Sequence, residues 1–289
     1  MCDHPSPKSS ARGTPGPERQ SLATGFREVD RSGDTDACHR CLDLITGIPF
    51  FHDIKEETFR IIARTNPGRV LDAGCGAGTD LATLASRLPP CCNFTGIDAS
   101  ESLLALATGR TMPFRDRVSL VKGDLIQIPV RDEQFDACRI DRVLQHLHEP
   151  EGVIRELVRV IKPGGVLIAF DNDWNTLSLS LDNQGTAGRI RRTWLESFAS
   201  GRIGRDLPGI FRESGLVDIH TEPRTLTLTD LPVAEQVFDL PHLLDRMEQA
   251  GILTPGGVLG VWDELHCRAD EGRFTSGYTG FIVWGMKPE

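Results

Sequence analysis

The sequence predicts an α/β fold with a seven-stranded, mostly parallel sheet and helices on both of its faces. Apolar segments of strand length alternate with segments of helical periodicity, which is the pattern of successive β–α–β units. A strand that ends at Asp72 runs directly into a glycine-rich turn and out into a helix. The next two strands are followed by carboxylates, Asp98 and Asp124, at the edge where open α/β sheets bind ligands.

The glycine-rich turn is Gly74-Cys-Gly76-Ala-Gly78. Glycine has no Cβ, so it permits a sharp turn and lets a ligand approach the main chain. A dinucleotide-binding loop has the spacing G-x-G-x-x-G, in which the third glycine comes one position later than Gly78. The turn therefore predicts a nucleotide-type cofactor and disfavours NAD.

The remaining elements follow the same alternation, and Lys162-Pro-Gly-Gly165 ends one helix because proline and paired glycines break its pattern. Asp171-Asn-Asp173-Trp174 is expected after the fifth strand, at the carboxyl edge of the sheet. Glycines at 277, 280 and 285 are expected to interrupt the last strand. Strands are expected at 69–72, 93–98, 118–121, 135–141, 166–170, 216–228 and 274–286, and helices at 79–88, 153–161, 186–200 and 207–214.

Composition limits the functions that the chain can have. Its 289 residues, 39% of them hydrophobic, can bury a sizeable core, and a formal net charge of −9 argues against a nucleic-acid surface. No run approaches the roughly 18 apolar residues that span a bilayer, and the N-terminus lacks the apolar core of a secretory signal. We therefore expect a cytoplasmic protein without nucleic-acid or membrane partners, as a monomer or a homodimer.

The chain divides into three parts. Residues 1–28 are rich in Pro, Ser, Gly and Arg and are expected to form a disordered tail. A transit peptide is the alternative, which the acidic Asp3 and Glu18 weaken. Residues 29–65 are expected to be helical, and residues 66–289 to form the catalytic domain, with a helical insertion at 231–271 before the last strand.

The eight cysteines are expected to be reduced thiols, because the chain is long and has no secretory signal. Cys38-His-Arg-Cys41 has the spacing of half a zinc site. A zinc site needs two further ligands, and the sequence offers no second matching pair. We expect no metal.

These motifs resemble those of the class I S-adenosylmethionine (AdoMet)-dependent methyltransferases, especially those of quinone biosynthesis and of small-molecule tailoring. The resemblance covers about residues 50–173. It implies a Rossmann-like fold, AdoMet as the cofactor and S-adenosylhomocysteine as the product. It also implies that the N-terminal helices form a lid over the cofactor and that the 231–271 insertion roofs the acceptor pocket. A helical hairpin that only packs is the alternative for the insertion.

The cofactor residues are expected at the ends of the first four strands. Asp98, about 20 residues beyond the glycine turn, is placed to accept hydrogen bonds from both ribose hydroxyls. The resemblance implies that Asp124 accepts a hydrogen bond from the adenine amino group. Each aspartate taken alone is equally consistent with a strand-end cap. The expected cofactor-binding residues are Asp72, Gly74, Gly76, Gly78, Asp98, Ala99, Asp124, Leu125, Asp141 and Arg142.

The sulfonium of AdoMet is already an activated methyl donor, so the protein has mainly to align a nucleophile with the methyl group. A base is needed only if the acceptor holds a proton. His146 is the first candidate for that base and Asp173 the second, although His146 could equally orient a loop. His148 and Trp174 are candidates for contact with the substrate.

The expected function is transfer of a methyl group to O, N or C of a small-molecule metabolite by in-line displacement. The alternative is an AdoMet-binding protein of the same fold that does not methylate and serves a structural, partner-binding or other role. The first predicts turnover to S-adenosylhomocysteine, whereas the second predicts binding without turnover.

Overall fold

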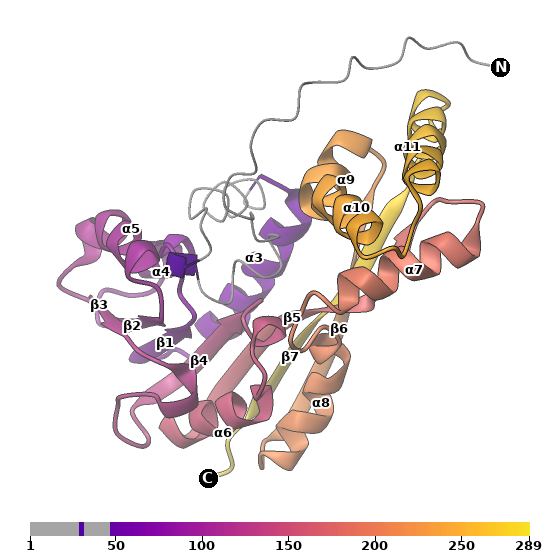
Figure 1. Cartoon of the computed structure of the whole chain (residues 1–289). Coiled ribbons are helices and arrows are strands. Elements are labelled where there is room, and N and C mark those ends of the chain that lie inside the picture. The colour runs from indigo at the N-terminus through magenta and orange to yellow at the C-terminus, as the bar shows by residue number, and fades with distance from the viewer. Residues whose placement is uncertain (1–28, 32–46) are drawn as a thin grey trace.

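The computed structural model describes residues 29–31 and 47–289, and its central feature is one twisted sheet (Figure 1). The expected tail at 1–28, most of the first half of the expected lid, and Cys38 and Cys41 lie outside the described residues. The strands are β1 (Arg69–Ala73), β2 (Asn93–Asp98), β3 (Val118–Lys122), β4 (Phe135–Asp141), β5 (Ile161–Leu179), β6 (Val217–Leu228) and β7 (Ser276–Met286).

The sheet has the order β3-β2-β1-β4-β5-β7-β6, and β7 runs antiparallel to both of its neighbours. All other pairs are parallel. This confirms the predicted seven-stranded, mostly parallel, Rossmann-like sheet. The longer helices are α3 (Pro49–Arg64), α4 (Thr79–Arg87), α5 (Glu101–Thr111), α6 (Pro150–Val160), α7 (Gln184–Leu195), α8 (Ile203–Glu213), α9 (Leu231–Val237), α10 (Leu240–Gln249) and α11 (Pro255–Asp270).

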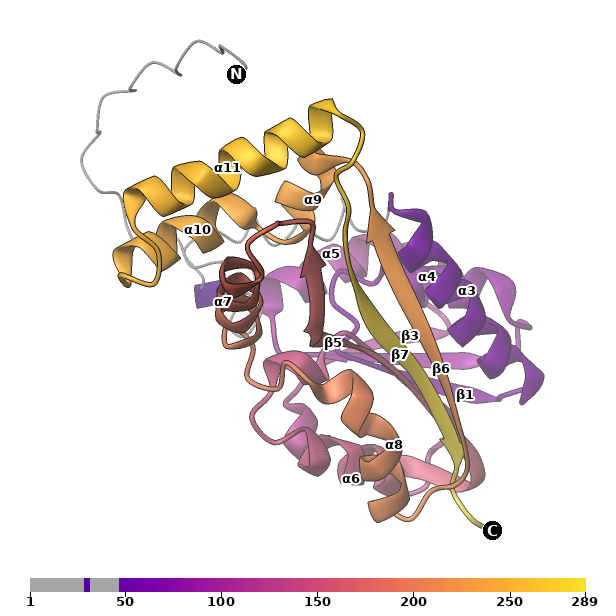
Figure 2. The same ribbon diagram turned by 90° about the vertical axis from the view of Figure 1, so that its right-hand side faces the viewer.

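Alternating residues of the strands pack against helices on opposite faces, as the period of two in a strand requires. Val70 lies in a buried cluster with side chains of α3 and α4, whereas its neighbour Leu71 lies in a cluster with side chains of α6 and α8. Figure 2 shows these two helix layers on either side of the sheet. Both faces of the parallel strands are therefore buried, which explains their nearly continuous apolar sequences.

The expected insertion forms α9, α10 and α11, which lie with α7 over one end of the sheet (Figures 1 and 2). A third buried cluster joins these helices to the ends of the long strands. It contains Trp174 of β5, Trp194 of α7, Phe238 after α9 and Tyr278 of β7. The insertion thus closes over a part of the core in which these aromatic side chains pack among aliphatic ones.

β5 is longer than the sequence predicts. The structure places Asp171 to Trp174 inside this strand, where a loop at its end was expected. The pairing with parallel β4 does end early, with Asp141 opposite Phe170, but antiparallel β7 continues to pair with β5 as far as Leu179. The extra hydrogen-bonding partner is therefore the reason for the longer strand.

Two of the glycines expected to interrupt the last strand instead allow close packing within β7. A Cβ built at Gly277 would lie 2.2 Å from the carbonyl oxygen of Leu226, and one at Gly280 would lie 2.5 Å from Cζ of Phe170. The segment Lys162–Gly165, expected as a turn, lies at the irregular start of β5, where Gly164 has φ +73°. The helix before it ends at Val160, one residue earlier than expected, because Ile161 already belongs to β5.

A buried ionic cluster lies behind the glycine turn. The side chain of Arg139 is 2% exposed and donates to Asp72 Oδ1 at 3.1 Å and to Asp80 Oδ2 at 2.9 Å. It also donates to Asp141 and, at 3.1 Å, to Thr58 Oγ1. One guanidinium group therefore ties together β1, β4, α4 and α3.

The pKa values of two carboxyl groups in this cluster, Asp72 and Asp141, are shifted in opposite directions. Burial raises the pKa of Asp72 to about 6, although Arg139 acts in the opposite direction. Burial also acts to raise the pKa of Asp141, but the attraction of Arg139 and Arg142 outweighs it and leaves that pKa below its ordinary value. Arg139 is the cation that all three acids share, while Asp80 also pairs with Lys55 at 2.6 Å and Asp141 with Arg142.

Arg139→Leu should lower the free energy of unfolding by about 3–5 kcal/mol at pH 8, because it leaves the buried Asp72 carboxylate without its counter-ion, whereas Asp80 keeps Lys55 and Asp141 keeps Arg142. The loss should be smaller at pH 5. Without the arginine the folded-state pKa of Asp72 rises further above its unfolded value, so the folded state takes up a proton as the pH falls and recovers stability. Urea unfolding of parent and variant at both pH values measures this.

The control is Arg87→Leu, which removes a 2.6 Å ion pair with Glu56 on the surface, where the arginine side chain is 45% exposed. Such a pair contributes about 1 kcal/mol or less. Equal losses for the two variants, or a loss for Arg139→Leu that does not change with pH, would contradict the assigned role of the cluster.

Candidate cofactor and acceptor site

A cavity opens at the carboxyl ends of the parallel strands, where the chain crosses from β3 back to β4 on the other side of β1. Open α/β sheets bind their ligands at such a switch point. One half of the cavity is lined by Gly74, Gly76, Asp98, Ala99, Leu103, Gly123, Asp124 and Leu125, and the other by Phe51, Asp141, Arg142, Gln145, His146, Asn172, Trp174, Trp194, Phe198, Val237 and Tyr278.

The glycine turn has the left-handed backbone that its sequence predicts. Gly74, Gly76 and Gly78 have φ values of +71°, +52° and +75°. A Cβ at Gly74 would lie 2.3 Å from Val143, and one at Gly78 would lie 2.8 Å from Ala107 of α5, so both positions need glycine for packing. Nothing in the described chain lies within 4 Å of a Cβ built at Gly76. Gly76 therefore exposes the main chain to open space in the cavity.

Asp98 stands at the end of β2, beside the turn. Its Oδ2 accepts a hydrogen bond from the Gly76 N–H at 2.8 Å, and its Oδ1 accepts one from the Ser100 N–H at 2.9 Å. Burial raises the pKa of this carboxyl, and the two N–H groups act against that shift. Each carboxylate oxygen has a second lone pair, so Asp98 keeps the capacity to accept two further hydrogen bonds from a ligand.

Asp124 and Leu125 form the opposite wall of the same half. Asp124 caps the short helix η3 (Leu125–Gln127) by accepting from the Ile126 N–H at 3.0 Å. The sequence was equally consistent with Asp124 as a cap and as a cofactor residue. The structure shows that Asp124 caps η3 through Oδ1 and also lines the cavity. Ala99 also lines this half.

Val29 lies against this half of the cavity and was missed by the sequence analysis. Its neighbour Asp30 holds it there, because the Asp30 carboxylate accepts from the Ser102 hydroxyl at 2.6 Å and from the Glu101 N–H at 2.8 Å, at the start of α5. These hydrogen bonds, that from Ser102 foremost, lower the pKa of Asp30 to about 2. Only the folded chain brings η1 (Val29–Arg31) and α5 together.

Some of the expected cofactor residues do not line the cavity. Asp72 is 2% exposed and points to Arg139 behind the turn, and Gly78 packs on α5. Asp141 and Arg142 do line it, and they pair with each other through Arg142 Nε and Asp141 Oδ1 at 3.0 Å. Arg142 has φ +55°, and its guanidinium lies 4.8 Å from the centre of the Phe51 ring.

The other half of the cavity is an aromatic wall. Trp174 stacks on Phe198 with ring centres 5.0 Å apart and planes 20° apart, and meets Tyr278 at 4.3 Å and Trp194 edge-on at 5.5 Å. The sequence analysis identified Trp174 but missed its partners. They come from α7, the segment after it and β7, up to about a hundred positions away in the chain, and no local pattern marks them.

Among the candidate catalytic and substrate side chains, His146 and Trp174 line the cavity. The ring centre of His146 lies 5.7 Å from that of Phe198. His148 is exposed and outside the lining. Asp173 is fully buried, pairs with Arg205 of α8 and is also outside the lining. Strand alternation explains this last result, because Asp173 points to the face opposite that of Trp174.

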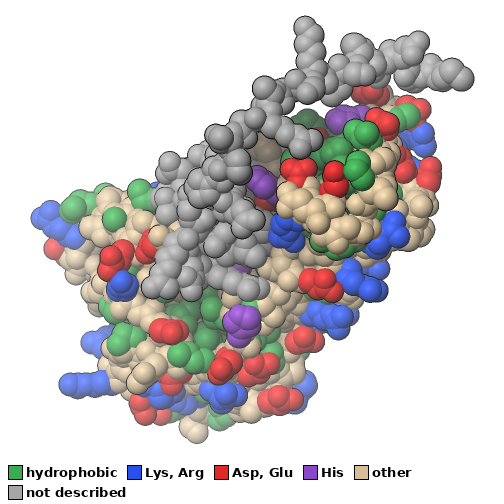
Figure 3. Space-filling view, in the orientation of Figure 1, with side chains coloured by type: hydrophobic (Ala, Val, Ile, Leu, Met, Phe, Trp, Pro, Cys, Tyr) green, Lys and Arg blue, Asp and Glu red, His purple; other side chains and the backbone are tan. Residues whose placement is uncertain are grey.

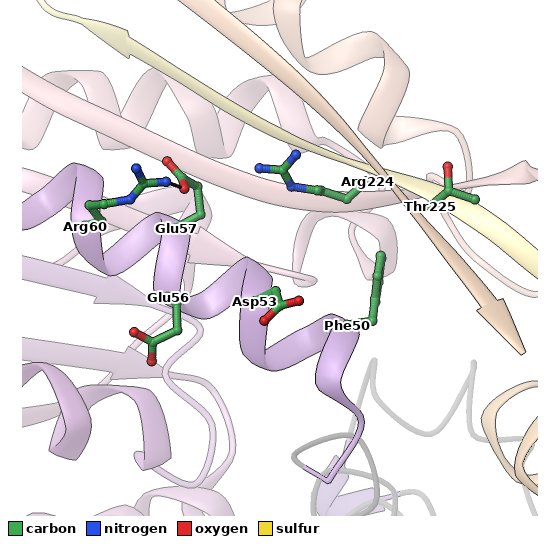
Figure 4. A pocket seen from close by; sticks show the side chains of 7 residues that line it. All are labelled: Phe50, Asp53, Glu56, Glu57, Arg60, Arg224 and Thr225. Atoms are coloured by element: carbon green, nitrogen blue, oxygen red, sulfur yellow. Dashed lines mark ion pairs between the residues drawn. The ribbon is translucent and has the colours of Figure 1, made fainter.

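A second hollow lies between α3 and β6 and shares no lining residue with the cavity (Figure 4). Its walls carry mainly charged side chains, among them Asp53, Glu56 and Arg224. Arg60 pairs with Glu57, as the dashed line in Figure 4 marks. Glu56, Glu57, Arg60 and Arg224 of this hollow are paired with charged side chains of the protein itself, so the hollow gives no indication of a ligand.

The described residues form neither a candidate metal site nor a candidate membrane-spanning helix. Within residues 29–31 and 47–289, no group of three or more His, Cys, Asp or Glu side chains could hold a metal ion. In the same part of the chain, no helix combines the length and the apolar character needed to cross a bilayer.

Known proteins share both the sequence and the fold. A family model described as a methyltransferase domain matches residues 71–169, from β1 into β5. An uncharacterized 37.1 kDa protein in transposon TN4556 of Streptomyces fradiae is 34% identical over 189 residues, covering 65% of this chain and 54% of that protein. Demethylmenaquinone methyltransferase of Bacillus cytotoxicus is 27% identical over 187 residues, covering 59% of this chain and 79% of the enzyme.

A methyltransferase domain of the class I, S-adenosylmethionine-dependent type therefore lies within this chain, at residues 71–169. The YcgJ protein of Bacillus subtilis has the same fold, with a TM-score of 0.56 at 15% identity over 81% of this chain and 99% of that one. The methyltransferase spans about half the length of the Streptomyces relative.

The cofactor of the methyltransferase is AdoMet, and the cavity fits it. Gly76 leaves its main chain open to a ligand, and the half-buried Asp98 keeps acceptor capacity for a ribose diol. Asp124 and Leu125 stand at the next strand end, where the adenine would lie. These residues would hold the nucleoside, and the residues after β4 would hold the methionine portion.

Asp98→Ala should weaken AdoMet binding by about 1–3 kcal/mol, the scale of lost hydrogen bonds to a charged group. The effect includes release of the glycine turn, since Asp98 also accepts from the Gly76 N–H. Calorimetric titration with AdoMet and S-adenosylhomocysteine measures it, and Asp116→Ala serves as a control because its carboxylate is 93% exposed and outside the cavity lining. Unchanged affinity in a folded Asp98→Ala variant would refute the ribose assignment.

Proposed function

We propose that the protein transfers a methyl group from AdoMet to O, N or C of a small-molecule acceptor. The observation that supports this proposal is that the glycine turn, Asp98 and the aromatic wall all line the same cavity. The half with the glycine turn would hold the cofactor and is called the cofactor half, and the half with the aromatic wall is called the acceptor half. In-line transfer requires the two in one cavity. The demethylmenaquinone methyltransferase relative is consistent with a small-molecule acceptor.

The lining of the acceptor half favours a largely apolar, flat molecule. Trp174, Trp194, Phe198 and Tyr278 offer broad aromatic surfaces, and Val237 of α9 adds an aliphatic one from the insertion. The charge of Arg142 is already balanced by Asp141. A strongly charged acceptor would therefore lose hydration without finding an uncompensated partner in this lining.

A macromolecular acceptor is a poorer fit. On the face that Figure 3 shows, basic and acidic side chains of the described residues are interspersed, and no broad basic area is present. Together with the formal net charge of −9, this is why we propose that nucleic acid is not a partner. A cytoplasmic location and a monomeric or homodimeric state remain predictions from the sequence.

The chain's own residues supply alignment and exclusion of water. When bound, AdoMet would supply the electrophilic methyl group. The aromatic wall orients the acceptor, while Phe51 of α3 and Val237 of α9 help to enclose it, in the roles proposed for the lid and the insertion. His146 stands in the same lining and is the ionisable ring that could contact the acceptor.

The test is formation of S-adenosylhomocysteine from AdoMet with a panel of phenols, quinols, amines and carbon acids. Turnover with a member of the panel supports the proposal. Tight AdoMet binding without turnover for any class of acceptor would instead support the non-methylating alternative.

Phe198→Leu should raise the acceptor KM about 5-fold, because a stacked aromatic contact contributes on the order of 1 kcal/mol. The Kd of AdoMet should stay unchanged, since Phe198 lies in the acceptor half. Trp262→Leu on α11 is the matched control, an aromatic side chain outside the cavity lining. Steady-state kinetics of the three proteins with the best acceptor would check this, and an equal KM for parent and Phe198→Leu would remove Phe198 from the acceptor wall.

A further inference from the structure

Gln145 is a buried polar residue at the centre of the acceptor half, and the proposed reaction leaves it without a role. It is 5% exposed and belongs to η4 (Leu144–His146), directly after the β4 strand end. Its main-chain N–H donates to Asp171 Oδ2 at 3.2 Å, and its carbonyl oxygen accepts from the Ser200 N–H at 3.0 Å. The backbone of Gln145 is thus fixed between β5 and the segment before α8.

Two neighbouring groups, one that can only donate a hydrogen bond and one that can only accept, determine the orientation of the Gln145 side-chain amide. The indole N–H of Trp174 can only donate, and it lies 2.8 Å from Gln145 Oε1. The carbonyl oxygen of Arg142 can only accept, and it lies 3.3 Å from Gln145 Nε2. Asn172 Nδ2 adds a second hydrogen bond to Oε1 at 3.1 Å. Turning the amide over would place like groups against each other at every one of these contacts.

The orientation of the amide in turn decides which ring nitrogen of His146 carries a proton. Gln145 Nε2 has two hydrogens, of which one is donated to the Arg142 carbonyl. The other points to His146 Nε2, 3.1 Å away. Since an amide nitrogen cannot accept, His146 Nε2 must be the unprotonated acceptor, and a neutral ring then carries its proton on Nδ1.

We propose that Gln145 is a positioning residue that holds His146 as the neutral Nδ1–H tautomer and links this ring to Trp174 in the acceptor wall. The catalytic consequence rests on the proposed methyl transfer, whereas the tautomer itself does not. The lone pair of His146 is engaged by Gln145, so the ring can take up a proton only by giving up that hydrogen bond. His146 therefore orients the acceptor as a neutral ring and does not act as the general base.

The first test reads the tautomer directly and needs neither AdoMet nor an acceptor. Nitrogen-15 NMR of the full chain distinguishes a protonated from an unprotonated ring nitrogen, and the His146→Gln variant identifies the signals of His146 by their loss. The expected result is an unprotonated Nε2 and a protonated Nδ1 in the parent protein. A proton on Nε2 in the parent overturns the proposal.

Gln145→Glu supplies the matched change, because it keeps the length of the side chain but offers an ionised oxygen where the amide nitrogen stood. His146 should then carry a proton on Nε2. His148, exposed on the same loop, should keep its signals and is the internal control. If Gln145→Glu does not fold, Gln145→Leu removes the amide donor to His146 Nε2 and should allow a mixture of tautomers. Retention of the parent tautomer in a folded variant contradicts the role assigned to Gln145.

Once an acceptor is known, Gln145→Leu should lower kcat about 10-fold while the Kd of AdoMet stays within about 2-fold. A His146→Gln variant should retain the pH profile of the parent, since the ring does not accept the acceptor's proton. A pH inflection that disappears with His146 would restore the general-base role and overturn this one. The NMR experiment does not require methyl transfer. A failure of the proposed methyl transfer can therefore be distinguished from a failure of the tautomer assignment.

Discussion

The buried charge of Arg139 holds together the part of the molecule on which the cofactor half depends. This one side chain connects the ends of β1 and β4, the first turn of α4 after the glycines, and α3. Buried carboxylates are costly unless they are paired, so the arginine and its acids must be positioned together. The glycine turn and Asp141 are therefore presented to the cavity by a common ionic support behind them.

The antiparallel strand β7 has the corresponding effect on the acceptor half. By pairing with β5 well beyond the end of β4, it extends the sheet past the usual edge and carries Trp174 and Tyr278 to the cavity. The insertion and α7 then cover this extension with apolar side chains. The cofactor half thus depends on short parallel strands, and the acceptor half on two long antiparallel ones.

Within the acceptor half lies a chain of polar contacts whose ends are groups of fixed character, the Trp174 N–H donor and the Arg142 carbonyl acceptor. Trp174, Gln145 and His146 are joined in it, next to the Arg142 backbone that follows β4. Buried hydrogen bonds of this kind rigidify a site because each partner restricts the next. The aromatic wall and the imidazole consequently form one unit rather than separate side chains.

The sequence by itself determined the fold class, which the structure confirms, and it marked the glycine turn and Asp98, which line one half of the cavity. Those features depend on local rules: alternation of strand and helix, glycines with positive φ, and carboxylates at strand ends such as Asp98. Only the tertiary structure decided that Asp72 faces Arg139, that Asp173 faces Arg205, and that residues as distant as Gln145 and Tyr278 share one cavity. The direction and the partner of a polar side chain depend on elements remote in sequence, and local periodicity carries no information about them.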